Sequence, residues 1–508
     1  MKDRLGNVQL YKNILMNIAA FFVQFVISFY ISPKIVADVG TAAYGYIGLA
    51  NDFVSYAGII ASVFNSVAAR FITKAYYEKD YLQANKYFNS LISTNFILSG
   101  ILSGISIIIV PNLDKVIAIP NDLLIDVKIT FAITFLSYIV TLLTLVFTTA
   151  TFVSNRTDIQ GIRNIIQNII RFAFILFFLN VLSIKLYWIS VAMFIATVFT
   201  AVLNIRLTKT LTPELKFDLK LSDRKYAMML AKSGCWMALT SISTILLRGL
   251  DLTIANVLLS EYDMGILSIA RTFPNNITTI IGTIAPIFTP VMIILYAKKK
   301  SAELDSKIKE SINIIVTLLY VPITGFIVYS EDFYRLWQSS LSTQEIKLVT
   351  VLSTVTVLQA YFNSSTASLA QLSVVANKLK VPVFVSLFCG IASVSLDVLL
   401  IKYTTLGIYA IVLSPTIVMI VRYVVFNSFY GAYCVDKKYM HFLPTVIKTW
   451  FSIPILFLII GGIHRLLPVN SWGTFLISVG VSAIIGYTFM VGAYQKNKLK
   501  LLLSKYLK

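Results

Sequence analysis

The chain has few charged residues, few cysteines and few histidines, and each shortage excludes a class of protein. Charged residues make up 13% of its 508 residues, against about 25% in an ordinary soluble domain. The three cysteines, Cys235, Cys389 and Cys434, show no metal-ligand or disulfide spacing, so we expect them to be packing residues. Because only His441 and His464 are present, a histidine-based metal site is not expected. We expect no metal site and no bound cofactor.

Long polar intervals are also missing, and this bears on enzyme function. The longest clearly polar interval, 208–226, is too short to hold a catalytic domain. A membrane glycosyltransferase or polysaccharide polymerase would need sizeable loops, and the longest outer intervals, 111–128 and 330–347, do not provide them. We therefore expect no catalytic domain and no catalytic residues. Although the net charge is +20, the basic residues form short scattered clusters, so a nucleic-acid partner is not expected.

What the chain does contain is a series of long apolar runs, and hydrophobic residues make up 57% of it. A membrane-spanning helix needs roughly 20 apolar residues, whereas a barrel strand needs about ten alternating ones. The runs are continuous and of the longer kind, which predicts an all-α polytopic membrane protein with about 14 transmembrane helices. The predicted spans are 14–31, 44–72, 88–110, 129–153, 165–182, 187–207, 233–259, 264–297, 308–329, 348–370, 382–401, 408–433, 445–463 and 472–494.

The distribution of lysine and arginine predicts the orientation of these spans. With the N-terminus inside, 31 of the 43 basic residues fall in cytoplasmic segments, 8 in outer loops and four inside spans. Cytoplasmic loops normally carry the excess of basic residues. We expect a multi-pass protein of the cell membrane with both termini in the cytoplasm.

Two stretches about 220 residues apart look alike. YGYIGLA at 44–50 aligns with MGILSIA at 264–270, and each stretch opens a long span that ends in a basic cytoplasmic loop. Six helices separate the copies, so the two halves would run in the same sense, as in the parallel repeats of many transporters. The alternative is a chance alignment of small residues at helix starts.

Several of these residues also carry a resemblance to a known family. They are YGY at 44–46 with Tyr56, Asp251 leading into Gly265 and Ala270, and SLDVLL at 395–400 followed by GIYA at 407–410. In these residues and in topology the chain resembles the polysaccharide (O-antigen or oligosaccharide repeat-unit) flippases of the multidrug/oligosaccharidyl-lipid/polysaccharide (MOP) superfamily. The resemblance implies two six-helix lobes around a central cavity lined by spans one, two, seven and eight, plus two C-terminal helices.

The expected domains are therefore an N-terminal lobe at 1–208, a C-terminal lobe at 209–435, and spans 13 and 14 with a basic tail at 436–508. The resemblance implies a flippase that moves undecaprenyl-pyrophosphate-linked oligosaccharide from the inner to the outer leaflet by alternating access. Its partners would be the lipid-linked oligosaccharide, membrane lipids and the polymerase and glycosyltransferases of polysaccharide assembly. The alternatives are a cation-coupled multidrug exporter, which usually has twelve spans and an acidic cavity, a lipid II flippase, and a membrane glycosyltransferase or polymerase.

The charged residues inside spans are the candidate substrate-binding residues, because a charge at mid-membrane depth costs roughly 2.5–3.5 kcal/mol unless it faces a cavity or a partner. Asp52 and Arg271 occupy nearly equivalent places in the repeat, about 10–12 Å into their spans. Arg271 would contact a phosphate or an acidic sugar. Asp52 would set the local field or bind a coupling proton or sodium ion. The alternative is a salt bridge between the lobes.

Arg248 and Asp251 stand at i and i+3 in the seventh span, which predicts one helix face on which they neutralise each other or offer donors to a phosphate. Arg70 would either extend to the inner interface or meet the pyrophosphate there. Gln24 would pack between helices or bind the sugar.

Other polar and proline positions complete the predictions. We expect Arg171 to reach the inner interface, Asp397 to reach the outer interface, and Arg422 to face protein. Pro274, Pro286 and Pro290 predict bending or local unwinding of the eighth span.

Overall fold

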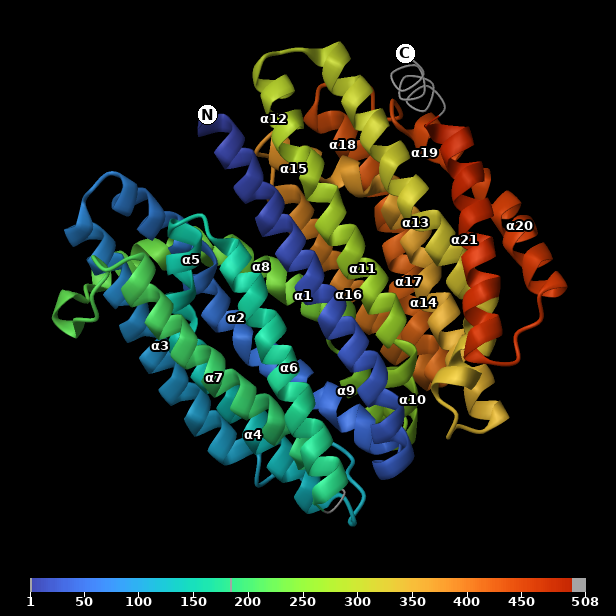
Figure 1. The fold of residues 1–508 in the computed structure, drawn as a ribbon, viewed down its shortest axis with the longest axis horizontal. Coiled ribbons are helices and arrows are strands. Elements are labelled where there is room, and N and C mark those ends of the chain that lie inside the picture. The colour runs from blue at the N-terminus through green and yellow to red at the C-terminus, as the bar shows by residue number, and fades with distance from the viewer. Residues whose placement is uncertain (1, 183–184, 496–508) are drawn as a thin grey trace. The chain divides into compact units, whose positions relative to one another are not determined.

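The structure is a computed structural model that describes residues 2–182 and 185–495 (Figure 1). Every regular element in these ranges is a helix, and 14 helical segments are long and apolar enough to cross a membrane. Helices suit a membrane interior because each satisfies its own backbone hydrogen bonds. The expected all-α polytopic membrane fold and its 14 spans are confirmed.

By its internal contacts, the chain divides into two compact units, Met1–Gly265 and Ile266–Lys508. This division comes one span later than the expected boundary at 208/209, because α8 (Arg224–Arg248) packs along α2 (Thr41–Tyr77). The lobes and their parallel repeat stay a prediction.

The other elements of the first unit follow in chain order. They are α1 (Lys2–Val39), α3 (Tyr81–Ile109), η1 (Leu113–Lys115), α4 (Leu124–Thr144), η2 (Leu145–Thr148), α5 (Thr149–Val153), α6 (Thr157–Val181), α7 (Tyr187–Leu211), η3 (Leu219–Leu221), α9 (Asp251–Leu258) and the first half of α10 (Glu261–Ala270). Within this unit α3, α4 and α7 lie side by side, and α6 packs against both α1 and α7 (Figure 1).

Glycines allow the closest approaches in the first unit. A Cβ atom on Gly234 of α8 would lie 1.7 Å from the carbonyl oxygen of Val63 on α2. A Cβ on Gly265 would lie 2.4 Å from the carbonyl oxygen of Thr41, and one on Gly45 would lie 3.0 Å from the Cα of Gly265. The two aligned glycines of the sequence repeat therefore touch each other, and neither position has room for a side chain.

The loop that joins α7 to α8, residues 212–223, is held on α3 by hydrogen bonds from side chains to its backbone. Asn85 Nδ2 donates to the carbonyl of Glu214 at 2.8 Å, and Asn85 Oδ1 accepts from the N–H of Lys216 at 2.7 Å. One helical turn later, Asn89 donates to the carbonyl of Lys216 at 2.9 Å and accepts from the N–H of Asp218 at 2.8 Å. We call this 212–223 segment the α7–α8 loop.

The second unit contains the remaining elements. They are the second half of α10, α11 (Thr272–Ile284), η4 (Ala285–Phe288), α12 (Thr289–Ala297), α13 (Ser301–Trp337), α14 (Thr343–Ala370), α15 (Leu372–Val375), α16 (Lys380–Tyr403), α17 (Ile408–Val421), the π-helical η5 (Arg422–Asn427), α18 (Ser428–Cys434), α19 (Leu443–Trp450), α20 (Ser452–Leu466) and α21 (Trp472–Tyr494). Helix α13 packs against α14, α20 and α21 (Figure 1).

Polar contacts fasten the last two spans to α13. Tyr329 Oη lies 2.7 Å from Ser478 Oγ and 2.8 Å from Ser482 Oγ on α21. His464 Nε2 of α20 lies 2.7 Å from a carboxylate oxygen of Asp332 on α13. The described part of the segment 436–508 is therefore integrated into the second unit.

Candidate functional site

A polar pocket of about 410 Å³ lies within the first unit, between α1, α6 and α7. We call it the Arg171 pocket. Its lining residues are Ala20 and Gln24 of α1, Asn164, Gln167, Asn168 and Arg171 of α6, and Met193 and Ala196 of α7. Among the residues that the structure describes, four carboxamides and one guanidinium line it, and no carboxylate does. The pocket is therefore cationic and rich in hydrogen-bonding groups.

The spacing along α6 explains why these side chains gather. Asn164, Gln167, Asn168 and Arg171 stand at i, i+3, i+4 and i+7, which places them on one face of a helix. The residues between them are largely apolar and lie on other faces. This stripe was readable in the sequence, although its partner on α1 was not.

Arg171 lies in the middle of its helix. At 1.5 Å per residue it is roughly 20 Å from Thr157 and 15 Å from Val181, the two ends of α6. An arginine side chain cannot cover either distance, so the expected position at the inner interface is wrong. The error came from starting this span at residue 165, eight residues too late. Within the described residues, the buried Nε of Arg171 has no hydrogen-bond acceptor.

A second arginine on α6 has a different environment. Arg163 is 6% exposed, and its guanidinium donates to Asn204 Oδ1 of α7. Close by, a Cβ atom on Gly161 would lie 2.7 Å from the backbone carbonyl carbon of Met16 on α1. The glycine lets α1 approach α6, and α1 carries Gln24 to the pocket. Of the six predicted site residues, Gln24 is the one that lines the Arg171 pocket.

The seventh span is interrupted between Arg248 and Asp251. Helix α8 ends at Arg248 and α9 starts at Asp251, so the expected single helix through both residues is wrong. Each end suits its charge, because a cation is stabilised at a helix C-terminus and an anion at an N-terminus. Both residues have interaction partners.

Tyr56 of α2 marks this interruption. Its hydroxyl donates to the carbonyl of Gly249 and lies 2.9 Å from Thr253 Oγ1 of α9. A side chain from another helix thus donates to a backbone carbonyl at the point where the helix is interrupted. Tyr56, noted above for its position alone, has a defined structural role.

The eighth span is interrupted at Arg271. Helix α10 ends at Ala270, and α11 starts at Thr272 with Pro274 in its first turn. Pro274 has no N–H to donate to the carbonyl four residues earlier, which accounts for the break. Pro286 lies within the 3₁₀ segment η4, and Pro290 follows at the start of α12. The structure thus has an interruption at Arg271 and a 3₁₀ segment at η4 where bending or local unwinding was predicted, and the bending stays a prediction.

The remaining predicted site residues are placed as follows. Counted from the observed helix starts, Asp52 lies roughly 16 Å into α2 and Arg271 roughly 15 Å beyond the start of α10, and their depth in the membrane stays a prediction. Both have interaction partners, and their encounter across a cavity stays a prediction. Arg70 is exposed near the end of α2, with its guanidinium carbon 5.6 Å from the ring centroid of Phe71.

Two charges of the second unit were assigned from the sequence. Arg422 donates to Ser386 Oγ of α16 at 2.7 Å, which confirms that it faces protein. Asp397 is 1% exposed and has an interaction partner, so its expected place at the outer interface is wrong. A carboxylate six residues from a helix end can reach the interface only if its face is open, and here the face is covered by protein.

Comparisons with known proteins agree with this architecture. No family model matches the chain. An uncharacterized membrane protein, EpsK of Bacillus subtilis (strain 168), is 25% identical over 504 residues, which are 98% of each chain. The structure of the lipid II flippase MurJ in an inward closed conformation superposes with a TM-score of 0.72 and 16% identity, over 96% of this chain and all of MurJ.

An inward-facing multidrug resistance MATE family transporter of the MOP superfamily has a TM-score of 0.67 and 14% identity. It covers 82% of this chain, while 94% of the MATE chain is matched. The chain has the fold of these transporters.

Proposed function

We propose that this chain is a MOP-superfamily flippase for undecaprenyl-pyrophosphate-linked oligosaccharide. It moves this lipid from the inner to the outer leaflet of the cell membrane by alternating access, for the assembly of a cell-surface polysaccharide. The polymerase and glycosyltransferases of that assembly would be its partners, and both termini would lie in the cytoplasm.

The observation that carries this proposal is the composition of the Arg171 pocket. A carboxamide both donates and accepts hydrogen bonds, which suits sugar hydroxyl groups. A guanidinium matches the oxygens of a phosphate or carboxylate bidentately. Four carboxamides around Arg171 therefore suit an anionic, hydroxyl-rich ligand.

The same composition speaks against a multidrug exporter of cationic drugs, which would need carboxylates in its pocket. The number of spans points in the same direction. The match to MurJ extends over 96% of this chain and the match to MATE over 82%, as expected for a chain with spans beyond twelve.

A lipid II flippase is the second candidate, supported by the TM-score of 0.72 with MurJ. Lipid II is also a lipid-linked pyrophosphate saccharide, so the Arg171 pocket suits both. Arg271, Arg248 and Asp52 remain proposed contacts of the headgroup or of a coupling proton or sodium ion, together with Asp251 and Arg70.

The test is transport in reconstituted vesicles. Leaflet exchange would be measured for a fluorescent undecaprenyl-pyrophosphate oligosaccharide, for lipid II, and for a cationic dye. A hydrogen bond to a charged group contributes about 1.5–3 kcal/mol, so Arg171→Ala should lower oligosaccharide exchange about 10- to 100-fold. Arg206→Ala, which removes an exposed arginine of α7 outside the pocket, is the matched control and should leave exchange unchanged.

The three substrates separate the candidates. Export of the dye without movement of either lipid would refute the proposal. Movement of lipid II alone would favour the second candidate. Arg271→Ala in the same assay tests the sequence-based site, and full activity of Arg171→Ala would remove the Arg171 pocket from the substrate path.

A further inference from the structure

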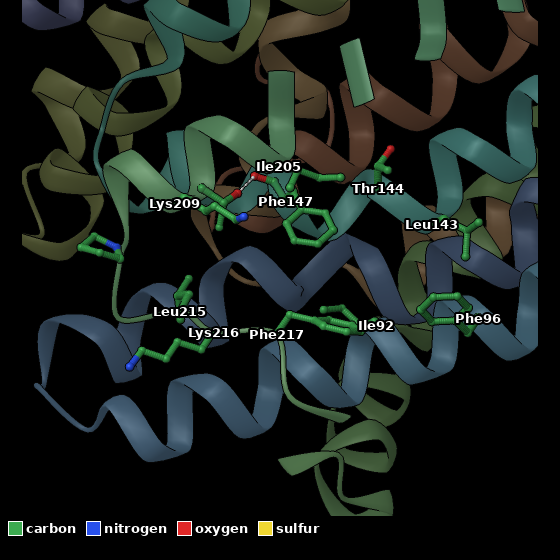
Figure 2. Close-up of a pocket in the computed structure, with 12 residues that line it drawn as sticks. Ile92, Phe96, Leu143, Thr144, Phe147, Ile205, Lys209, Leu215, Lys216 and Phe217 are labelled. Carbon is green, nitrogen blue, oxygen red and sulfur yellow. Dashed lines mark hydrogen bonds between the residues drawn. The ribbon is translucent and has the colours of Figure 1, made fainter. Parts of the chain in front are cut away.

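A second pocket of the first unit lies between α3, α4, α7 and the α7–α8 loop, and its volume is about 660 Å³ (Figure 2). We call it the lysine pocket. Its lining is apolar except for two lysines, two threonines and backbone groups. One of the threonine hydroxyls, that of Thr208, already donates to the carbonyl of Phe147 at 2.9 Å. The size is that of a small-molecule site.

The two ends of the lysine pocket differ in chemistry. Lys209, in the last turn of α7, and Lys216, in the loop, lie in the same half of the pocket as Leu215, with their ammonium groups pointing in different directions (Figure 2). Phe96 of α3 and Leu143 of α4 line the other end (Figure 2). The lysine end is at the C-terminal end of α7 and in the loop that follows it, and the apolar end lies farther along α3 and α4. This polarity is that of a lipid with its headgroup at the surface.

Neither lysine of the pocket is compensated by a nearby carboxylate in the part of the chain that the structure describes. Neither forms an ion pair with a carboxylate of the described residues. The nearby carboxylates of the loop have other partners. Glu214 accepts from Tyr76 Oη, and Asp218 accepts from the backbone N–H of Lys220 at 3.0 Å.

The hydrogen bond from Tyr76 also lowers the pKa of Glu214 below its ordinary value. At neutral pH this carboxylate is therefore ionised and hydrogen-bonded to Tyr76. It is held by the tyrosine of α2 rather than by Lys209 or Lys216. Both ammonium groups can therefore bind an external anion without first breaking an ion pair.

We propose that the lysine pocket binds one anionic phospholipid of the surrounding bilayer. Its phosphate would lie at the end of the pocket lined by Lys209 and Lys216, and an acyl chain would run past Phe217 toward Phe96 and Leu143. Phe96 is 50% exposed and Phe217 57% exposed, so the pocket is open to a lipid. Basic pockets between spans are established places for anionic headgroups.

The lining argues for a phospholipid rather than for the saccharide-bearing substrate. The carboxamides that line the Arg171 pocket have no counterpart among the residues lining the lysine pocket. A headgroup with several sugars would leave its hydroxyl groups unpaired there, whereas a phosphodiester needs only the two cations. The proposal is therefore independent of the transported substrate.

The test is lipid binding to the purified full-length protein in detergent, followed by native mass spectrometry. Phosphatidylglycerol is the anionic probe and phosphatidylcholine the zwitterionic one. Because each basic residue near a membrane surface contributes a factor of about five to the affinity for anionic lipid, Lys209→Ala with Lys216→Ala should weaken phosphatidylglycerol binding about 30-fold. The matched control, Lys220→Ala in the loop with Lys225→Ala in the first turn of α8, removes the same charge outside the pocket and should change the affinity less than twofold.

A third variant tests the apolar end without touching a charge. Thr144→Trp would fill the pocket next to Leu143, and it should lower phosphatidylglycerol binding at least tenfold while the melting temperature of the lipid-free protein stays unchanged. Equal weakening by both lysine pairs would show nonspecific surface attraction and overturn the proposal. Equal binding of phosphatidylcholine and phosphatidylglycerol would also overturn it. The same holds if undecaprenyl phosphate binds at the site and phosphatidylglycerol does not.

Discussion

The Arg171 pocket and the lysine pocket belong to the same unit and share α7, but their linings are opposite. Met193 and Ala196 of α7 line the first, and Ile205 and Lys209, farther along the same helix, line the second. In the Arg171 pocket the cation lies at mid-helix among carboxamides. In the lysine pocket one cation lies at the end of α7 and the other in the loop, next to aromatic and aliphatic side chains.

This difference shows that the surroundings of a cation decide which ligand it suits. A guanidinium at mid-membrane depth costs roughly 2.5–3.5 kcal/mol, so its position requires polar neighbours or a ligand. A lysine at the end of a span has no such cost, because its ammonium group reaches water. We infer a sugar phosphate for the first pocket and a simple phospholipid for the second, and three changes test this contrast.

The largest expected effect comes from Gly161→Ala. The added methyl group would meet the backbone of Met16, so α1 and α6 must separate, at a cost of about 1–3 kcal/mol in the free energy of unfolding. Denaturation in detergent measures this cost, and vesicle exchange should fall because Gln24 moves away from Arg171.

The control is Gly100→Ala on α3, where the new methyl group meets nothing within 4 Å. It should stabilise its helix by up to about 1 kcal/mol. Phosphatidylglycerol binding should be unchanged in both variants. Equal stability of the two glycine variants would contradict the close contact of α1 with α6.

A smaller effect is expected for Asn89→Ala, which alters the wall of the lysine pocket. The variant leaves the N–H of Asp218 and the carbonyl of Lys216 without their partner. Loss of one such bond costs about 1.4 kcal/mol, so hydrogen exchange at the Asp218 amide should become about tenfold faster. Asn112→Ala, at an exposed asparagine of the 110–123 loop, is the control and should not alter exchange at Asp218.

The smallest effect is expected for Gln24→Leu in the Arg171 pocket. A neutral hydrogen bond contributes about 1 kcal/mol, so the KM for the lipid-linked oligosaccharide should rise about five-fold with little change in kcat. Gln83→Leu on α3, outside both pockets, is the control and should leave this KM unchanged. An unchanged KM would mean that Gln24 only packs between helices.

The elements that could be predicted from sequence are those set by local composition. Hydropathy located 14 spans because each span satisfies its own backbone and needs only length and apolarity. The prolines of the eighth span predicted its interruptions because proline removes a specific backbone donor.

The break in the seventh span could not be predicted in this way. Gly249 and Leu250 keep right-handed helical dihedrals, with φ −92° and −94°, and the local sequence has no proline. The interruption involves a hydrogen bond from Tyr56, which is nearly 200 residues away in the chain. A contact of that kind depends on the tertiary fold.

The candidate site was predictable in part. The polar stripe of α6 shows in its spacing, and Gln24 was selected as an intramembrane polar residue. That the two meet depends on the approach of α1 to α6 at Gly161. Arg171 was misplaced because the span was started too late, and Asp397 because hydropathy does not tell which face of a helix is covered.

The way in which α3 holds the α7–α8 loop bears on how freely that loop can vary. Asn85 and Asn89 bind main-chain groups of Glu214, Lys216 and Asp218, and these groups are the same in every amino acid except proline. The exposed side chains of this loop, such as Lys216 and Phe217, can thus be exchanged for labelling or for a change of charge without loss of these main-chain bonds. Proline at 216 or 218 is the exception, because it removes the N–H that the asparagine binds.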